Sequence, residues 1–399
     1  MEKLASGWRR NIQVATPAVA AVTALAVSLS ACSAPVTTAK TLQATTAQSQ
    51  SPQSSAIAAI VRQGMQTYHL RAVIVRVTKG GKVVTTQAFG PSMTGAPATP
   101  AMHFRNGAVA FAYVATLLME YVDEHKVSLS DTINRWVPSL PEANRVTLKM
   151  LANQTSGYPD FETDPAWTAA FNADPFRIFT YKERLGYAFR RPVQFPPGKS
   201  WSYSLTNFMI LGHILSMIGK KPLATLLRQK VLKPMGLTGT TSSETSSMPN
   251  PVLHSFSSER EVALHVPSKV TFYEEATYWN TVWGTPAGAN ETTNIYDLIK
   301  TAVAVGTGKL LSRSSYHAMT GNFGLGVVKA GSWILQDPLL SGWSSTEAYL
   351  PAQKIAIAVV ATFDPAAFNS AGVEPDASDP IFRSIGAYLA PNDPPPTKK

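Results

Sequence analysis

The sequence Gly107-Ala108-Val109-Ala110-Phe111 opens the segment GAVAFAYVATLLMEYVDEH, which covers residues 107–125. Apolar residues recur in it at the helical period, alanine, leucine and methionine are plentiful, and proline is absent. This pattern predicts one long helix that is buried over most of its surface.

Strand patterns lie toward both ends of the chain, and helical patterns lie at 56–65 and through much of the middle to about residue 240. The segments 72–77 and 82–87 flank Lys79-Gly80-Gly81, which is the signal of a β-hairpin. Further strands are predicted at 326–328, 332–335, 345–350 and 355–361. Strands from the two ends must then meet in one antiparallel sheet, so we expect a mixed α and β (α+β) domain with helices around the sheet and a mostly helical lobe.

The N-terminus has the layout of a secretory signal. Lys3, Arg9 and Arg10 precede an apolar run over about 14–29, and small residues then lead to Cys32. This resembles the site at which bacterial lipoproteins are cleaved and acylated, which predicts lipidation of Cys32. The alternatives are a transmembrane helix, for which the apolar run is short, and a secreted protein without lipid.

These features divide the chain into four parts. We predict a lipoprotein signal peptide over 1–31, a disordered tether over 32–54, a folded domain over 55–390 and a polar tail over 391–399. The tether is rich in Ser, Thr, Ala and Gln and has too few large apolar residues to fold. The expected location is the extracytoplasmic face of the cell membrane, with the lipid on Cys32 as the anchor.

Composition narrows the possible partners. Hydrophobic residues make up 45 % of the chain, which suffices for a large core, and the net charge is +10. Removal of residues 1–31 takes away Lys3, Arg9, Arg10 and Glu2 and leaves +8. A basic surface suits anionic lipids or wall polymers, whereas scattered basic residues and export argue against nucleic acid.

Cys32 is the single cysteine, so no intrachain disulfide can form.

Short motifs follow one another in a fixed order from about residue 56 to 365. They are Phe104-Arg105-Asn106-Gly107, Val127-Ser128-Leu129-Ser130-Asp131, Trp136-Val137-Pro138, Thr147-Leu148-Lys149-Met150-Leu151, Gln154-Thr155-Ser156-Gly157-Tyr158, Pro197-Gly198-Lys199, Trp201-Ser202-Tyr203-Ser204, Leu211-Gly212, Pro234-Met235-Gly236-Leu237 and Gly342-Trp343-Ser344-Ser345. This series resembles the serine β-lactamase and penicillin-binding protein family, which includes class C β-lactamases, D-Ala-D-Ala carboxypeptidases and esterases. The resemblance implies a β-lactamase/transpeptidase-like fold and a cleft beside the helix that starts near Gly107.

That family uses a Ser-x-x-Lys motif at the start of the buried helix, where a lysine one turn away accepts the proton of the serine hydroxyl. In this chain Ala108 stands at the position of the nucleophile and Phe111 at the position of the base. No serine lies three residues before any lysine, and the one threonine so placed is Thr37, before Lys40 in the tether. The motif has therefore not moved elsewhere.

Two further family motifs are altered. Tyr-x-Asn reads Tyr203-Ser204-Leu205, so the amide is replaced, and Tyr203 alone is as well explained by packing. The strand motif His-x-Gly or Lys-Thr-Gly reads Gln336-Asp337-Pro338, which lacks the cation and the glycine. Proline also lacks an N–H, which an edge strand tolerates.

The resemblance still implies a cleft, and we expect it to be lined by Ala108, Phe111, Tyr203, Leu205 and Leu339. The backbone N–H groups of Ala108 and of a residue near Leu339 could bind a carbonyl or carboxylate oxygen. Residues 167–187 are rich in aromatic side chains, which either border this cleft or fill the helical core. The sequence predicts no cofactor and no metal site, because it contains no phosphate-binding or dinucleotide glycine pattern and its seven histidines show no metal spacing.

These observations favour a catalytically inactive, β-lactamase-related envelope lipoprotein that binds a small molecule, a peptidoglycan fragment or a protein. One alternative is a hydrolase of esters, β-lactams or peptidoglycan-type amides that uses a non-standard site. Another is a purely structural envelope protein. The cleft around Ala108 helps to separate these hypotheses: an open and polar cleft would favour a working site, whereas a cleft filled by Phe111 would not.

Overall fold

A computed structural model describes residues 51–242, 245–267, 269–279, 291–321, 324–370 and 372–397. Cys32 and the predicted signal peptide lie outside these residues. Within the described part of the chain, no helix is long and apolar enough to cross a membrane.

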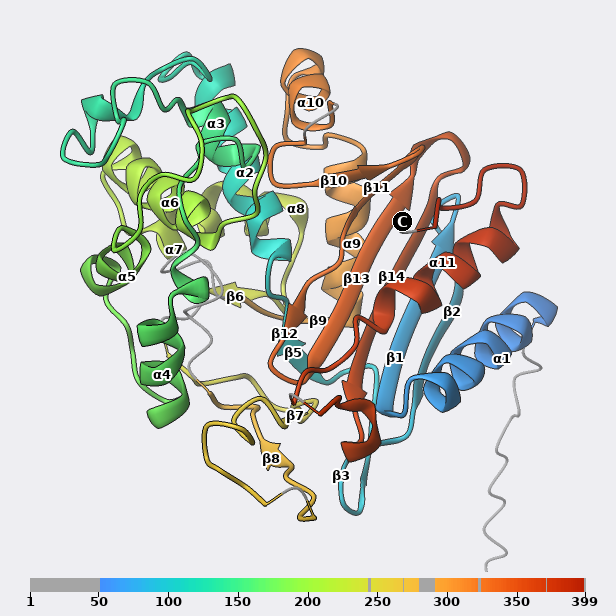
Figure 1. Ribbon diagram of the computed structural model, residues 1–399. Coiled ribbons are helices and arrows are strands. Elements are labelled where there is room, and N and C mark those ends of the chain that lie inside the picture. Colours follow the sequence, from blue (N-terminus) through green and yellow to red (C-terminus); the bar gives the residue numbers. More distant parts are fainter. Residues whose placement is uncertain are drawn as a thin grey trace, which may run out of the picture. The chain divides into compact units, whose positions relative to one another are not determined.

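One antiparallel sheet joins the two ends of the described chain (Figure 1). Its path runs β10-β11-β13-β14-β1-β2, and the short strand β12 also pairs with β13. The strands are β1 (Leu70–Lys79), β2 (Lys82–Phe89), β10 (Val328–Ala330), β11 (Trp333–Gln336), β12 (Leu339–Leu340), β13 (Trp343–Leu350) and β14 (Ile355–Phe363). In the central pair, Val75 of β1 lies opposite Val359 of β14.

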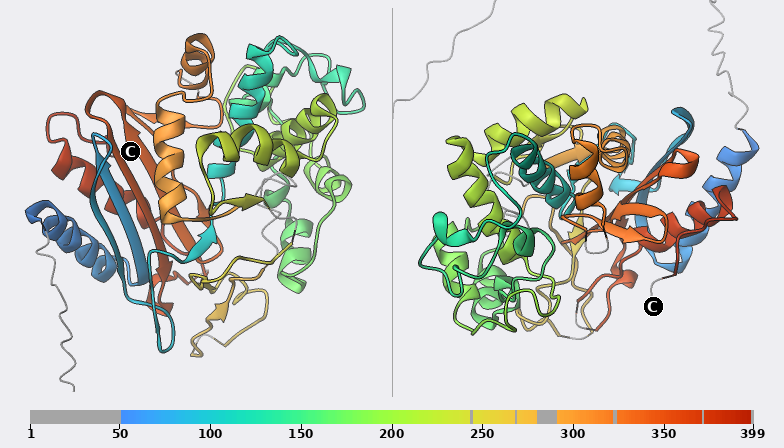
Figure 2. Two further views of the ribbon diagram at one scale, coloured as in Figure 1. Left: turned by 180° about the vertical axis from the view of Figure 1, so that it is seen from behind. Right: turned by 90° about the horizontal axis from the view of Figure 1, so that it is seen from above.

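The alternation of side chains along β14 gives the sheet two different faces. Ile355, Ile357 and Val359 belong to the core beneath α1 (Pro52–Thr67) and α11 (Ser378–Leu389). Their neighbours Ala356, Ala358 and Val360 face the larger core, where α9 (Ile295–Gly306) packs on β13 and β14. Figure 2 shows α1 and α11 on one side of the sheet and α9 on the other.

The helical lobe lies beside the face of the sheet that carries α9 (Figures 1 and 2). Its α-helices are α2 (Val109–Asp123), α3 (Leu148–Ala152), α4 (Pro165–Ala173), α5 (Tyr181–Ala188), α6 (Leu205–Gly219), α7 (Leu223–Leu226) and α8 (Lys233–Met235), and α10 (Arg313–Met319) packs on α2. The side chains of α2 from Val109 to Met119 are all buried.

Short strands connect the lobe to the main sheet. They are β3 (Pro91–Met93) with β4 (Ala96–Pro97), β5 (His103–Arg105) with β9 (Glu291–Asn294) and β6 (Thr241–Ser242), and β7 (Phe256–Ser257) with β8 (Glu274–Glu275). Strand β5 leads directly into α2, so it sets where the buried helix begins.

The fold predicted from the sequence is confirmed: a mixed α and β domain with strands from both ends in one antiparallel sheet and a buried helix after residue 107. The predicted turn at Gly80-Gly81 has positive φ at both residues, as a tight hairpin requires. One boundary differs, because α1 begins at Pro52, inside the predicted tether. Ser51 caps this helix and proline is well suited to its first turn, so the helix starts earlier than its apolar residues indicate.

Gly342, at the start of β13, is a position where the fold requires glycine. Its φ is +81°, and a Cβ there would lie 2.3 Å from the carbonyl oxygen of Phe256. We expect Gly342→Ala to lower the free energy of unfolding by more than about 2 kcal/mol, from backbone strain and the clash together. Chemical denaturation measures this change.

Gly95→Ala is the matched control, because Gly95 has a φ of +76° and nothing within 4 Å of its would-be Cβ. It should cost only the backbone strain, about 1 kcal/mol. Equal losses for the two variants would show that Phe256 does not constrain β13.

Candidate ligand-binding cleft

The start of α2 forms the floor of a cleft between the helical lobe and the main sheet. Gly107 has a φ of +50°, and a Cβ on it would lie 2.9 Å from Cβ of Pro338. The missing side chain therefore lets the corner between β5 and α2 pack against Pro338. Ala108 is the N-cap residue of α2 and makes no side-chain hydrogen bond.

Phe111 lies one turn further along α2 and is 3 % exposed. Its ring stacks on Phe208 of α6, with centroids 3.9 Å apart and planes inclined by 5°. The ring of Tyr203 lies on the cleft side of Phe111, 6.1 Å away and tilted by 33°. Phe111, at the position where the family motif has a lysine, is thus the middle one of three neighbouring aromatic rings.

The segment Tyr203-Ser204-Leu205 enters α6 and is anchored to the lobe by Gln154. The Gln154 side-chain oxygen accepts hydrogen bonds from the Ser204 backbone N–H, at 3.1 Å, and from Nδ2 of Asn207, at 2.6 Å. Leu205 is buried, whereas Tyr203 is 45 % exposed. Gln154 thereby holds the Tyr203 ring at the open side of the cleft.

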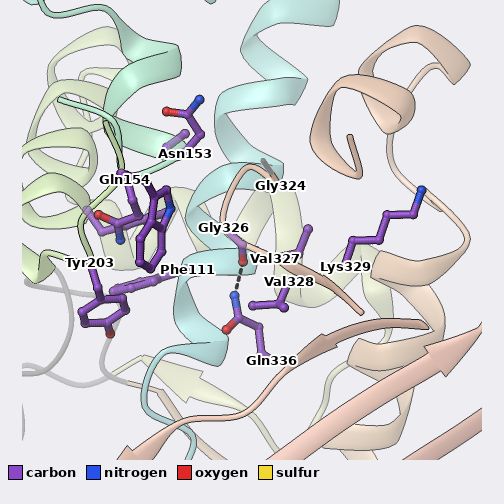
Figure 3. Close-up of a pocket in the computed structure, with 13 residues that line it drawn as sticks. Phe111, Asn153, Gln154, Tyr203, Gly324, Gly326, Val327, Val328, Lys329 and Gln336 are labelled. Atoms are coloured by element: carbon purple, nitrogen blue, oxygen red, sulfur yellow. Dashed lines mark hydrogen bonds between the residues drawn. The ribbon is translucent and has the colours of Figure 1, made fainter. Parts of the chain in front are cut away.

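The opposite wall is the strand segment Gln336-Asp337-Pro338. Gln336 pairs with Glu347 and Leu339 pairs with Ser344, so β11 and β12 keep one register on β13 across the interruption at Asp337 and Pro338. The Gln336 amide donates a hydrogen bond to the carbonyl of Gly326 (Figure 3). Gln336 therefore fixes the loop before β10 instead of presenting a cation to the cleft.

Two adjoining cavities lie between these walls. The outer cavity has a volume of about 510 Å³, and its lining includes Ala108, Leu205, Pro338 and Leu339. The inner cavity, of about 200 Å³, is bounded by Phe111, Phe208, Asn153, Gln154 and the turn from Gly324 to Val328. Both cavities are lined by Trp201, Tyr203, Val328 and Gln336. The cleft around Ala108 is therefore open, and Phe111 forms the inner wall without filling the space.

The electrostatic character of the cleft comes from carboxyl groups. Glu162 lines the outer cavity, and desolvation followed by the charges of Asp160 and Glu259 raises the pKa of its carboxyl well above the usual value. Desolvation and the carboxyl groups of Glu162 and Asp160 raise the pKa of the Tyr203 phenol. Because nearly half of Tyr203 is open to solvent, the carboxyl groups are the firmer cause. Tyr203 is therefore poorly suited to act as a base.

Asp337 also lines the outer cavity, and it belongs to a second acidic group behind the strand. One oxygen each of Asp337, Asp376 and Asp379 lie within 4.8 Å of one another. Arg383 donates a hydrogen bond of 2.7 Å to Asp379, and Ser344 donates one of 3.3 Å to Asp376. This acidic group was not foreseen from the sequence, because its members lie on β11–β12 and at the start of α11.

All the cleft residues proposed from the sequence lie around these two cavities. Ala108, Tyr203, Leu205, Gln336, Pro338 and Leu339 line the outer cavity, and Phe111 lines the inner one. Sequence reasoning missed Trp201, Glu162 and Phe208. Trp201 and Phe208 flank the Tyr203 motif, and Glu162 follows the Tyr158 motif by four residues, so the motifs marked the right segments but not these side chains.

Most aromatic residues of the region 167–187 belong to the core, whereas Phe176 is 58 % exposed. Trp167 stacks on Phe171 with centroids 5.4 Å apart and also contacts Phe161 and Phe179. None of these rings lines either of the two cavities. The core interpretation of this region is therefore correct.

The family model for β-lactamase matches residues 57–374, which is most of the chain. The chain belongs to the β-lactamase family. The match covers the main sheet, the helical lobe and both walls of the cleft.

Curated relatives match over parts of their length. The D-aminopeptidase of Brucella anthropi is 28 % identical over 186 residues, 46 % of this chain and 35 % of that protein. The putative penicillin-binding protein PbpX of Bacillus subtilis is 24 % identical over 249 residues, 61 % of this chain and 57 % of that protein. Protein flp of Staphylococcus aureus strain COL is 23 % identical over 200 residues, 48 % of this chain and 38 % of that protein. The chain thus spans between about a third and somewhat more than half of these relatives.

Solved structures support the same fold. D-amino acid amidase from Ochrobactrum anthropi SV3, complexed with D-phenylalanine, superposes with a TM-score of 0.69 at 21 % identity, covering 79 % of this chain and 95 % of that one. The octameric penicillin-binding protein homologue from Pyrococcus abyssi superposes with a TM-score of 0.69 at 17 % identity, covering 85 % of this chain and 77 % of that one.

Phe111 should contribute strongly to stability because its ring is buried and stacked on Phe208. We expect Phe111→Ala to lower the free energy of unfolding by about 3 kcal/mol. Phe176→Ala serves as the control, because Phe176 is 58 % exposed and its loss should cost less than about 1 kcal/mol. Chemical denaturation compares the two, and similar small losses would mean that the Phe111 ring is not part of the core.

Proposed function

We propose that this protein is a catalytically inactive member of the β-lactamase family that binds a small ligand in the cleft beside α2. The observation that carries the proposal is the pair Ala108 and Phe111 at the start of that helix. Neither side chain can form an acyl bond or accept a proton, and active relatives depend on a serine and a lysine at these places.

The loss is too large to be compensated by the rest of the cleft. Removal of the nucleophile alone costs on the order of a million-fold in rate in a well-studied serine hydrolase. Here Leu205, Gln336 and Pro338 replace the remaining polar groups of the family motifs as well. Backbone N–H groups at Ala108 and Leu339 remain as donors for a ligand oxygen.

The outer cavity supports a binding role. Its volume of about 510 Å³ falls within the range of small-molecule sites. Trp201 and Tyr203, which are 53 % and 45 % exposed, give it an aromatic rim that a ligand could cover. A purely structural protein has no need for an open cleft of this size.

The alternative is hydrolysis by non-standard residues, and one observation favours it. Glu162 and Tyr203 line the same outer cavity, and a carboxyl group with a raised pKa is a candidate general acid or base. The named relatives include a D-aminopeptidase and a D-amino acid amidase, so amide hydrolysis is the reaction to test.

We further propose that the protein is exported and held at the extracytoplasmic face of the cell membrane by a lipid on Cys32. The support is the sequence Leu29-Ser30-Ala31-Cys32 after an apolar run. A single cysteine at this place, in a chain of net charge +10, suits a lipid anchor close to an anionic surface.

The full chain should form no covalent adduct with fluorescent penicillin or with a fluorophosphonate, because no serine of the described residues lines either cavity. Intact-protein mass spectrometry after incubation with each reagent measures this. A stoichiometric adduct mapped to any serine would refute the inactive role and support the hydrolase.

Ala108→Ser is the informative companion variant. It returns a hydroxyl to the start of α2 but leaves Phe111 without basicity, so it should remain unreactive as well. Labelling of Ala108→Ser but not of the parent chain would reveal a base that the proposal overlooks.

Cys32→Ser should prevent lipidation and either release the protein from membranes or stall removal of the signal peptide. Cell fractionation with labelled palmitate gives both readouts. Ser33→Ala, next to the proposed site, is the control and should remain membrane-bound. If Cys32→Ser is processed and retained like the parent chain, the anchor lies elsewhere.

A further inference from the structure

The cleft has a charge opposite to that of the protein. The chain carries a net charge of +10, yet among the described residues no Lys, Arg or His lines the outer cavity, where the acidic residues are Glu162 and Asp337. Of the described residues that line the inner cavity, Lys329 is the basic one. Its side chain extends away from Phe111 and Tyr203 in Figure 3, and its backbone lies at the exposed strand β10.

Glu162 is the carboxyl group available to a ligand. Among the described residues, no side-chain hydrogen bond and no ion pair engages its carboxylate, whereas Asp337 belongs to the acidic group that also contains Asp376 and Asp379. The charged groups that act most strongly on Glu162 are themselves acidic, namely Asp160 and Glu259. A cation brought beside Glu162 would therefore relieve repulsion and gain an ion pair that the protein itself does not supply.

The aromatic rings of the cleft also favour a positively charged ligand. Phe111, Phe208, Tyr203 and Trp201 surround or border the inner cavity. Elsewhere in the described chain, cations lie over aromatic rings, as Arg71 does over Phe256 at 4.8 Å and Arg76 over Tyr296 at 4.9 Å. No such cation of the described chain covers these four rings, and Trp201 and Tyr203, which are 53 % and 45 % exposed, are the two rings that a ligand cation can reach.

The two cavities define the shape of the ligand. They share Trp201, Tyr203, Val328 and Gln336, so one molecule can extend from the inner into the outer cavity. The inner cavity, of about 200 Å³, has polar side chains from Asn153, Gln154 and Gln336 in its lining, and its aromatic side, formed by Phe111 and Phe208, suits a phenyl ring or a branched alkyl group. Glu162 lies on the outer cavity, where the polar end of such a molecule would be placed.

We infer that the cleft binds an amphipathic organic ammonium ion, with its apolar group against Phe111 and Phe208 and its ammonium group between the rim aromatics and Glu162. A ligand with a free carboxylate is disfavoured, because its charge would oppose ionisation of the nearby carboxyl groups, whereas an ammonium group would favour the ionised form of Glu162 and pair with it. This inference rests on the proposed ligand-binding role and specifies the class of ligand.

Three matched probes test the inference on the full chain in a nonionic detergent. They are 2-phenylethylamine, 3-phenylpropionate and 2-phenylethanol, which share the phenyl group and differ in charge. Isothermal titration calorimetry should show the amine binding at least about tenfold more tightly than the carboxylate, with the alcohol between them. Equal or tighter binding of the carboxylate, or no binding of any of the three, would overturn the inference.

Glu162→Gln tests the proposed partner of the ammonium group. It should weaken the amine about fivefold and leave the alcohol unchanged, because only the ion pair is lost. Glu142→Gln is the matched control, since Glu142 is an exposed carboxylate of the helical lobe paired with Arg145. If the ratio of amine to alcohol affinity is the same in Glu162→Gln as in the parent chain, Glu162 is not the group that recognises the ammonium ion. The preference of the cleft for cations is then judged from the three probes on the parent chain alone.

Phenylalanine amide separates failure of this inference from failure of the proposed function. It is a monocation with a phenyl group and a cleavable amide. Binding without release of ammonia supports both statements. Binding with release of ammonia would refute the inactive role and leave the preference for cations standing, whereas no binding would overturn the ligand class.

Discussion

The pairing of β1 with β14 is the constraint on which the rest of the molecule depends. It joins segments almost 290 residues apart, with Val75 opposite Val359, and the strand alternation then fixes which side chains enter which core. Alanines of β14 meet α9 and larger residues meet α1 and α11, so the sheet has one face for close helix packing and one for a deep apolar layer. Strands β13 and β12 are built outward from β14, and they carry the wall of the cleft.

The sequence predicts best those elements in which apolar residues recur regularly or without interruption. The β14 segment is an unbroken apolar run, and α2 has buried residues on all sides, so both patterns persist over several turns or pleats. The beginning of α1 was misplaced because Ser51 and Pro52 determine it by capping, not by apolar spacing. The altered motif segments do converge on one cleft, because each of them lies where an element begins or ends beside the cleft.

The residues that the sequence did not reveal come from irregular segments. Glu162 lies in a short 3-10 helix, and Trp201 lies in the segment before α6. In such segments apolar residues do not recur regularly, so the sequence does not indicate the direction of a side chain. The sequence also did not show whether the cleft is open. Phe111 could have filled the space left by a lysine, but its stacking on Phe208 turns it into the wall between the lobe core and the inner cavity.

The substitutions on which the proposed loss of acyl transfer rests also change which groups line the cleft. The family motifs have a lysine at the position of Phe111 and a histidine or lysine at the position of Gln336 on the wall strand. With Phe111 and Gln336 in their places, the cleft keeps carboxyl groups and open aromatic faces, while Gln336 is committed to the Gly326 carbonyl. The proposed loss of catalysis and the proposed preference for cations would therefore both follow from the same replacement of charged by uncharged side chains.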